Sequence, residues 1–312
     1  MVTVRCSAFI LLLSLVSPCV FADGPADNLA ENVRPIPPEG IVVPDDKKES
    51  LEGGLSELRT KIEELQKAGE TNPVIQQYLP DVEICYKAVH DALQHNEFFK
   101  PNEIDFAHNL LETGYSRAAS LREGKAPWAQ ETGFVFRGYR SRIDGSVQPY
   151  GLEIPQHYRF ESNEKWRLDF WFHGRGEKLS ELSFIQQRST GAGGKIKPDN
   201  AFVLHPYGRY SNANKFAGEI DLFEALAHAQ RDYRIDEDRM LVRGFSMGGA
   251  ACWQFAVHFP GLWAAAQPGA GFSETPDFLK TFQGETLKPT WWEEKLWRWN
   301  DATDWALNLA NV

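Results

Sequence analysis

The segment from residue 240 to 250 constrains the fold of this chain more than any other stretch. Its sequence is MLVRGFSMGGA: three apolar residues, then the pattern Gly-Xaa-Ser-Xaa-Gly-Gly, then an apolar run with helical spacing. A buried strand that turns this sharply into a helix brings residues 244 and 248 so close together that side chains there would clash, and both positions are glycine. The segment therefore predicts a strand–turn–helix unit with Ser246 at its apex.

Ser246 is a candidate nucleophile because such a turn strains the serine backbone and presents its hydroxyl at the edge of a sheet. The five-residue pattern alone occurs by chance in many proteins. Here an apolar strand pattern precedes it and a helical pattern follows, so the context agrees on both sides. The alternative is a glycine-rich turn whose serine only caps the helix.

The chain length bounds the number of globular parts, and the net charge excludes some classes of partner. A chain of 312 residues has room for one large core and one smaller globular part. Its formal charge of -10 and pI of about 5.4 argue against nucleic acid or an anionic membrane surface as a partner. No His, Cys and Asp spacing predicts a metal site, and no glycine-rich phosphate loop predicts a nucleotide, so we expect no cofactor.

Residues 1–22 have the three parts of a cleavable signal peptide. Arg5 supplies the charge, residues 9–16 the apolar run, and Val20-Phe-Ala22 the cleavage site. This predicts a secreted or periplasmic protein, and the apolar run is too short to span a bilayer. A lipoprotein signal at Cys19 is the weaker alternative because Pro18 precedes it. Removing the signal leaves Cys85 and Cys252, which we expect to be free, buried thiols.

Two segments precede the strand patterns. Residues 23–50 are rich in proline and charge and predict a disordered linker. Residues 51–125 predict a helical module of three amphipathic helices, the first from residue 51 to Gly69, the others over 81–99 and 101–121. The first helix is too short for a coiled coil, so packing within the chain is favoured over dimerisation. The sequence does not predict an oligomeric state.

Residues 130–312 alternate strand and helix patterns, which is typical of a mainly parallel sheet with helices on both faces. Asp144-Gly145 between the first two strand patterns indicates a hairpin. A charged turn is expected at Asp236 and Asp238. The expected strands cover 133–139, 147–154, 166–172, 200–206, 240–245 and 262–267, and the expected helices cover 179–187, 220–233 and the residues after Ser246.

Four motifs resemble the α/β-hydrolase fold: Asp144-Gly-Ser-Val-Gln-Pro-Tyr150, His173-Gly-Arg-Gly176, Asp236-Glu-Asp-Arg239 and Gly244-Phe-Ser-Met-Gly-Gly249. Within that fold, residues 130–312 look most like prolyl oligopeptidase-like catalytic domains and secreted esterases. The resemblance implies an acyl-enzyme mechanism, in which a serine attacks a carbonyl with the help of a histidine oriented by an acid. It does not distinguish ester substrates from amide or peptide substrates.

The reaction also needs donors for the oxyanion that forms. The Met247 N–H, at the start of the helix after Ser246, is one candidate, and the loop Gly174-Arg175-Gly176 offers the second. The alternative for this loop is a flexible turn at a strand end. His173 is expected to hold the loop by hydrogen bonds rather than to act as a base.

Tryptophans crowd the segment 291–305. One interpretation is a core-facing or cap helix, on which Trp292, Leu296 and Trp299 share one face. The other is an aromatic wall beside Ser246, in which Trp291 and Trp292 bind a sugar or aryl group.

The expected acid and base are missing from the sequence. In this fold they follow the serine along the chain, but only His258 lies downstream of Ser246, on the same helix. Residues 308–312 look like the lead into another strand. These features predict a domain that is truncated at its C-terminal side, with acid and base beyond residue 312. Two hypotheses follow: a secreted serine hydrolase whose sequence is a fragment, or a non-catalytic binding protein that retains the fold.

Overall fold

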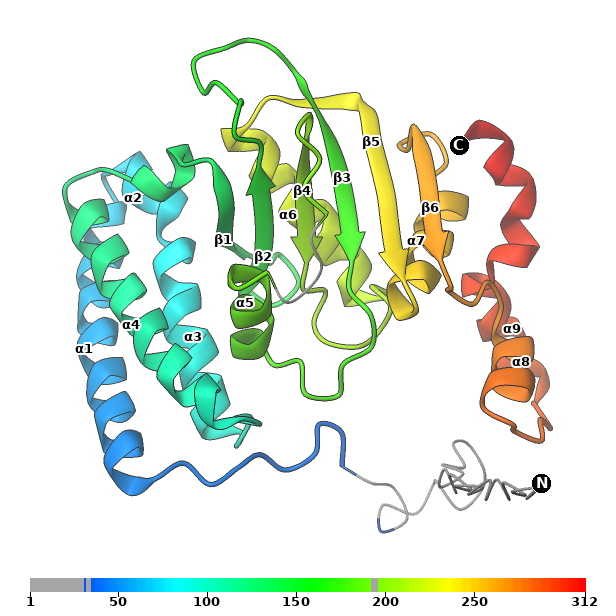
Figure 1. Cartoon of the computed structure of the whole chain (residues 1–312), viewed down its shortest axis with the longest axis horizontal. Helices are drawn as coiled ribbons and strands as arrows, with labels where there is room; N and C mark the ends of the chain where they lie inside the picture. Colours follow the sequence, from blue (N-terminus) through cyan, green and yellow to red (C-terminus); the bar gives the residue numbers. More distant parts are fainter. Residues whose placement is uncertain (1–30, 32–34, 192–195) are drawn as a thin grey trace, which may run out of the picture.

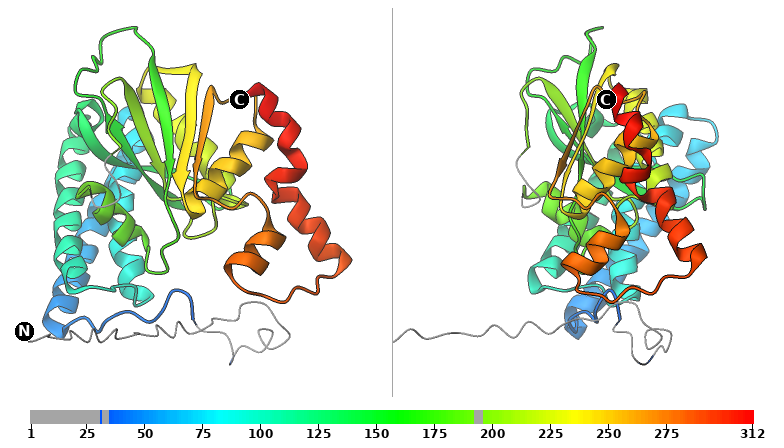
Figure 2. Two further views of the ribbon diagram at one scale, coloured as in Figure 1. Left: turned by 45° about the vertical axis from the view of Figure 1, so that its right-hand side comes forward. Right: turned by 90° about the vertical axis from the view of Figure 1, so that its right-hand side faces the viewer.

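The computed structural model describes residues 31, 35–191 and 196–312. The predicted signal peptide and most of residues 23–34 lie outside this part. Helices near the N-terminus stand beside a twisted sheet, and the last helices lie beyond its opposite edge (Figure 1). The left view of Figure 2 shows the same order from the helical module to the C-terminal helices.

The helical module contains four helices in the described part: α1 (Asp45–Gly69), α2 (Pro73–Tyr78), α3 (Pro80–Gln94) and α4 (Pro101–Arg122). The predicted apolar face of α1 is buried. Helix α1 begins at Asp45, so the linker predicted up to residue 50 is wrong over its last six residues. The sequence also missed α2, which Asn72 caps through its side chain, and α3 ends at Gln94 rather than at residue 99.

The sheet has six strands: β1 (Gly133–Arg140), β2 (Val147–Ile154), β3 (Trp166–Phe172), β4 (Ala201–Pro206), β5 (Ile235–Phe245) and β6 (Ala265–Gly269). Their order is β1-β2-β4-β3-β5-β6. The pairs β1–β2 and β2–β4 are antiparallel, whereas β4–β3, β3–β5 and β5–β6 are parallel. The sheet is therefore mixed, and its parallel part contains the strand before Ser246.

The crossover helices lie on both faces of the sheet. They are α5 (Glu181–Ser189), α6 (Ala217–Asp232) and α7 (Met247–His258). The chain moves in one direction across the sheet from β3 to β4, and in the other from β4 to β5 and β6. Right-handed crossovers then place α5 on one face and both α6 and α7 on the other. Figure 1 shows α6 behind the strands and α5 in front.

Two predicted strands, β5 and β6, have other bounds in the structure. Strand β5 begins at Ile235, so Asp236 and Asp238 lie in a strand rather than in a turn. The strand is irregular there, because Trp166 pairs with Ile235 but Leu168 pairs with Met240. Strand β6 covers residues 265–269 instead of 262–267.

The C-terminal segment also departs from expectation. Residues 302–311 form a 3-10 helix, η5, where the sequence suggested a strand-like lead at 308–312. Before it lies α9 (Trp291–Asn300), which has no buried residue. Trp292, Leu296 and Trp299 are 51%, 49% and 58% exposed. The core-facing interpretation of this helix is therefore wrong.

A buried ionic cluster joins the helical module to the sheet. Asp81, at the start of α3, and Arg137, on β1, are both fully buried. The Arg137 Nε donates to both carboxylate oxygens of Asp81, at 3.0 and 2.9 Å. The Arg137 Nη2 donates to Asp232 of α6 at 2.8 Å. One guanidinium thus connects three elements that are distant in sequence.

Cys85 and Cys252 are free and buried, as predicted.

Within the residues that the structure describes, no helix combines the length and apolarity needed to cross a bilayer.

Candidate active site at the strand–helix turn

The turn at Ser246 has the geometry that the sequence predicts. Ser246 joins β5 to α7 with φ 57° and ψ −123°, a conformation that residues other than glycine rarely adopt. Its N–H donates to the Gly269 carbonyl at the end of β6 (2.8 Å). A Cβ on Gly244 would lie 2.2 Å from the Gly248 carbonyl oxygen. The strained serine is therefore held between two neighbouring strands.

The loop after β3 lies against the same turn. A Cβ placed on Gly174 would be 3.9 Å from the Ser246 Cβ, so the structure brings these two predicted site residues together. Met247 is the first residue of α7, and its N–H has no acceptor within the helix. The Met247 N–H and the loop at Gly174 are therefore both adjacent to Ser246, as two donors to one oxyanion must be. Their catalytic role stays a prediction.

Arg175 and Gly176 have other partners. The Arg175 side chain is half exposed and pairs with Glu177 at 3.1 Å. The Gly176 N–H donates to the Ser211 hydroxyl at 3.1 Å. If this loop supplies the second oxyanion donor, the N–H of Gly174 or Arg175 is the better candidate.

His173 holds the loop, in agreement with the sequence-based expectation. Its Nδ1 lies 2.9 Å from the Gly174 carbonyl oxygen and its Nε2 lies 2.9 Å from the Tyr207 carbonyl oxygen. The ring is buried, and burial lowers the pKa of His173. A neutral imidazole carries one N–H, which one of these two carbonyls accepts, and both contacts keep the ring against the backbone rather than against Ser246.

The sequence did not predict the residues that fasten this loop from the β4–α6 connection. The Tyr210 hydroxyl donates to the Glu177 carbonyl at 2.6 Å, and the Tyr207 hydroxyl donates to the Leu179 carbonyl at 3.1 Å. The connection has six positive φ angles, at Gly208, Arg209, Tyr210, Ala213, Asn214 and Phe216. Its contacts with the loop are too distant in sequence to infer.

None of the eight histidines of the sequence bonds the serine, although the structure describes all of them. His205 is buried, and burial lowers its pKa well below the usual range. His228 pairs with the Tyr150 hydroxyl at 2.8 Å. His258 lies at the far end of α7, where its ring contacts Trp305 (centroids 4.9 Å apart). Ser246 therefore has no histidine base among the described residues.

Trp291 and Trp292 pack edge to face with their centroids 5.6 Å apart, and they are 71% and 51% exposed. Their exposure leaves both rings free to contact another molecule. Substrate binding by these rings stays a prediction.

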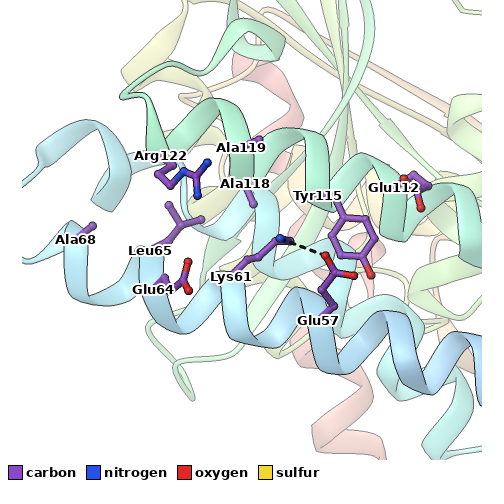
Figure 3. Close-up of a pocket in the computed structure, with 10 residues that line it drawn as sticks. All are labelled: Glu57, Lys61, Glu64, Leu65, Ala68, Glu112, Tyr115, Ala118, Ala119 and Arg122. Atoms are coloured by element: carbon purple, nitrogen blue, oxygen red, sulfur yellow. Dashed lines mark ion pairs between the residues drawn. The ribbon is translucent and has the colours of Figure 1, made fainter.

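Across the described ranges, no group of three or more His, Cys, Asp or Glu side chains could hold a metal ion. A pocket on the helical module lies between α1 and α4, where Lys61 pairs with Glu57 at 3.2 Å (Figure 3). All residues that line it belong to these two helices, so it contains none of the predicted site residues.

Comparisons with known proteins agree with the resemblance seen in the sequence. Residues 209–311, which include the strand–helix turn, match the prolyl oligopeptidase family. No curated protein matches. Similar solved structures include a thermostable esterase (23% identity, 45% of this chain and 41% of that chain, TM-score 0.34). Another is a fluorophosphonate-binding serine hydrolase from Staphylococcus aureus, with 16% identity over 58% of this chain and 73% of that chain and a TM-score of 0.42. A third is a ferulic acid esterase, with 14% identity over 57% of this chain and 76% of that chain and a TM-score of 0.40.

The chain thus spans less than half of the thermostable esterase. The strand order, the turn at Ser246 and the family match together identify an α/β-hydrolase fold with a helical N-terminal region.

Proposed function

We propose that this chain, which has an α/β-hydrolase fold, is a secreted serine hydrolase that cleaves ester, amide or peptide bonds through an acyl-enzyme at Ser246. The observation that carries the proposal is the strained backbone of Ser246, placed beside Gly174 and at the N-terminus of α7. Secretion rests on the signal-peptide pattern of residues 1–22.

The chemistry follows from these positions. The Ser246 Oγ attacks the substrate carbonyl carbon and gives up its proton to a base, and the carbonyl oxygen becomes an oxyanion. The Met247 N–H and an N–H of Gly174 or Arg175 donate to this oxyanion. When the intermediate collapses, the bond to the leaving alcohol or amine breaks and the base returns the proton to it. Water then attacks the acyl-enzyme in the same manner and releases the acid.

The base and its acid are proposed to come from outside these 312 residues. His173 is committed to two backbone carbonyls, and His205 is buried with a lowered pKa. A serine hydroxyl without a base is a poor nucleophile, and removing triad members costs about 10⁴- to 10⁶-fold in rate.

The lack of a base also favours one alternative: a binding protein that retains the hydrolase fold without catalysis. The two functions differ in whether Ser246 forms a covalent intermediate.

Hydrolysis of 4-nitrophenyl acetate distinguishes them. The 312-residue chain should show very low turnover alone, and added imidazole should raise it because imidazole can accept the Ser246 proton. The Ser246→Ala variant corrects for hydrolysis by imidazole itself, and Ser273→Ala is the matched control that keeps the nucleophile. If wild type and Ser246→Ala are equal in imidazole, the binding function is favoured. Fast Ser246-dependent turnover without imidazole would instead point to His173 or His205 as the base.

A further inference from the structure

Arg209, in the connection between β4 and α6, joins three elements through its guanidinium. Its Nε donates to Asp221 of α6 at 2.8 Å, and its Nη1 donates to Asp144 in the turn between β1 and β2 at 2.6 Å. Its Nη2 donates to the hydroxyl of Ser141, the residue after β1, at 2.8 Å. The Arg209 side chain is 20% exposed and Asp221 is buried, so solvent and salt screen these ion pairs only in part.

This network holds a strained backbone. Gly208, Arg209 and Tyr210 have φ angles of 62°, 56° and 82°, and two of these three consecutive residues are not glycine. Strained residues persist only where the surrounding structure determines their conformation. The three partners of the Arg209 guanidinium supply such a restraint at the middle residue. The course of the chain after Arg209 therefore depends on this network.

Tyr210 and Ser211, the next two residues, hold the far end of the loop after β3. The Tyr210 hydroxyl donates to the Glu177 carbonyl at 2.6 Å. The Ser211 hydroxyl accepts the Gly176 N–H at 3.1 Å and donates to the Gly176 carbonyl at 3.2 Å. The far end of the loop is thus bound through both N–H and carbonyl groups to the residues that follow Arg209.

The near end of the same loop packs against α7. A Cβ on Gly248 would lie 2.9 Å from the His173 carbonyl oxygen, and Gly174 lies beside Ser246. Gly174 and Arg175 therefore lie between two anchored ends, and the direction of their N–H groups depends on both anchors. Direction matters for an oxyanion donor, because a misplacement of about 1 Å can cost about 100-fold in rate.

The hairpin motif Asp144-Gly-Ser-Val-Gln-Pro-Tyr150 gains a physical role from this network. Its first residue, Asp144, also accepts hydrogen bonds from the Ser146 N–H at 3.0 Å and from the Ser146 hydroxyl at 2.6 Å. These two bonds fix the carboxylate within the turn, where it meets the Arg209 guanidinium. The motif thus supplies a rigid acceptor for an arginine that is distant in sequence.

We propose that Arg209 is a positioning residue for the oxyanion donors at Ser246. It ties the β1–β2 hairpin and α6 to the connection whose next two residues hold the loop after β3. Arg209 acts through this loop and not on the substrate. The inference rests on the proposed function, because the donors serve an oxyanion that forms when Ser246 attacks a carbonyl.

Amide hydrogen exchange, measured by NMR on the 312-residue chain, tests the coupling without catalysis. In Arg209→Met and in Ser211→Ala, the Gly176 N–H should exchange about tenfold faster or more than in wild type, because its acceptor is displaced or lost. The double variant should exchange little faster than either single one, since both changes remove the same restraint. Arg239→Met is the matched control: it breaks an arginine–aspartate pair of 2.6 Å near the start of β5 and should leave this exchange unchanged.

Asp144→Ala keeps the proposal testable if Arg209→Met fails to fold. Asp144 is partly exposed, and its loss leaves the ion pair between Arg209 and the buried Asp221 in place. We expect the Gly176 N–H to exchange about threefold faster or more in this variant. Exchange at the wild-type rate in Asp144→Ala, or in a folded Arg209→Met protein, would overturn the proposal.

Fluorophosphonate labelling of Ser246, with imidazole as the base, separates this inference from the proposed function. In Arg209→Met the maximal labelling rate should fall about tenfold while the half-saturating probe concentration stays the same, and Arg239→Met should label as wild type does. Equal maximal rates in wild type and Arg209→Met would overturn the positioning role and leave the proposed function standing. An unlabelled wild type, together with the expected exchange rates, would overturn the proposed function and leave Arg209 as the residue that holds the loop.

Discussion

Asp81→Ala is expected to lower the free energy of unfolding by about 3–5 kcal/mol, because it leaves the buried Arg137 without its main partner. The Asp81 carboxylate accepts from the Arg137 Nε, the Gly138 N–H (2.7 Å) and the Trp128 indole N–H (2.9 Å). Burial alone would raise the pKa of Asp81, but the charges of Arg137 and Arg117 outweigh burial and lower it. The contribution of this carboxylate is therefore present above the usual pKa of an aspartate and is lost as the pH falls through the lowered value.

Urea unfolding at neutral pH measures this loss. Asp105→Ala is the control, because Asp105 is an exposed aspartate on α4 and its removal should change stability by less than about 0.5 kcal/mol. A loss of under about 1 kcal/mol for Asp81→Ala would contradict the role assigned to the cluster.

Gly248→Ala is expected to destroy the turn at Ser246. A Cβ on Gly248 would lie 2.2 Å from the Phe172 carbonyl oxygen and 2.9 Å from the His173 carbonyl oxygen. Both contacts are with backbone, so neither can be relieved by a side-chain rotation. The loop after β3 must move away from α7, and we expect a loss of stability above about 4 kcal/mol or failure to fold.

Gly261→Ala is the matched control, since a Cβ there meets nothing within 4 Å and the residue has no positive φ. Thermal unfolding of the two variants gives the comparison. A Gly248→Ala protein with the same melting temperature as Gly261→Ala would show that the turn is looser than described.

Local signals allowed much of the fold to be predicted. The turn at Ser246 was predictable because the steric demand for glycine at 244 and 248 acts over only five residues. The strands β1 to β4 were predictable because apolar runs and the Asp144-Gly145 turn mark them. Helix α1 began earlier than expected because Pro44 can precede a helix, and Asp45 and Asp46 stabilise its first turn.

The other predictions that failed depended on contacts between elements that are distant in the sequence. Strand β5 pairs with β3 at Ile235 and again from Met240, and the charged residues 236–239 between them form an irregularity that a turn pattern in the sequence cannot distinguish from a loop. The spacing of Trp292, Leu296 and Trp299 predicted a buried face, but spacing gives only a shared face and not what covers it. The residues that hold the loop after β3, such as Tyr210, come from a connection more than 30 residues away.

The site itself was only partly predictable. Ser246 and Gly174 were found from motifs, and the structure places them together.

Labelling by a fluorophosphonate probe tests most directly whether Ser246 is a nucleophile. The serine oxygen displaces fluoride from phosphorus, and peptide mass mapping locates the modified residue. With imidazole present as the base, we expect a label on Ser246 in the 312-residue chain and in Ser273→Ala, and none in Ser246→Ala. Equal labelling of Ser246→Ala, or an unlabelled Ser246 in the wild-type chain, would contradict the account.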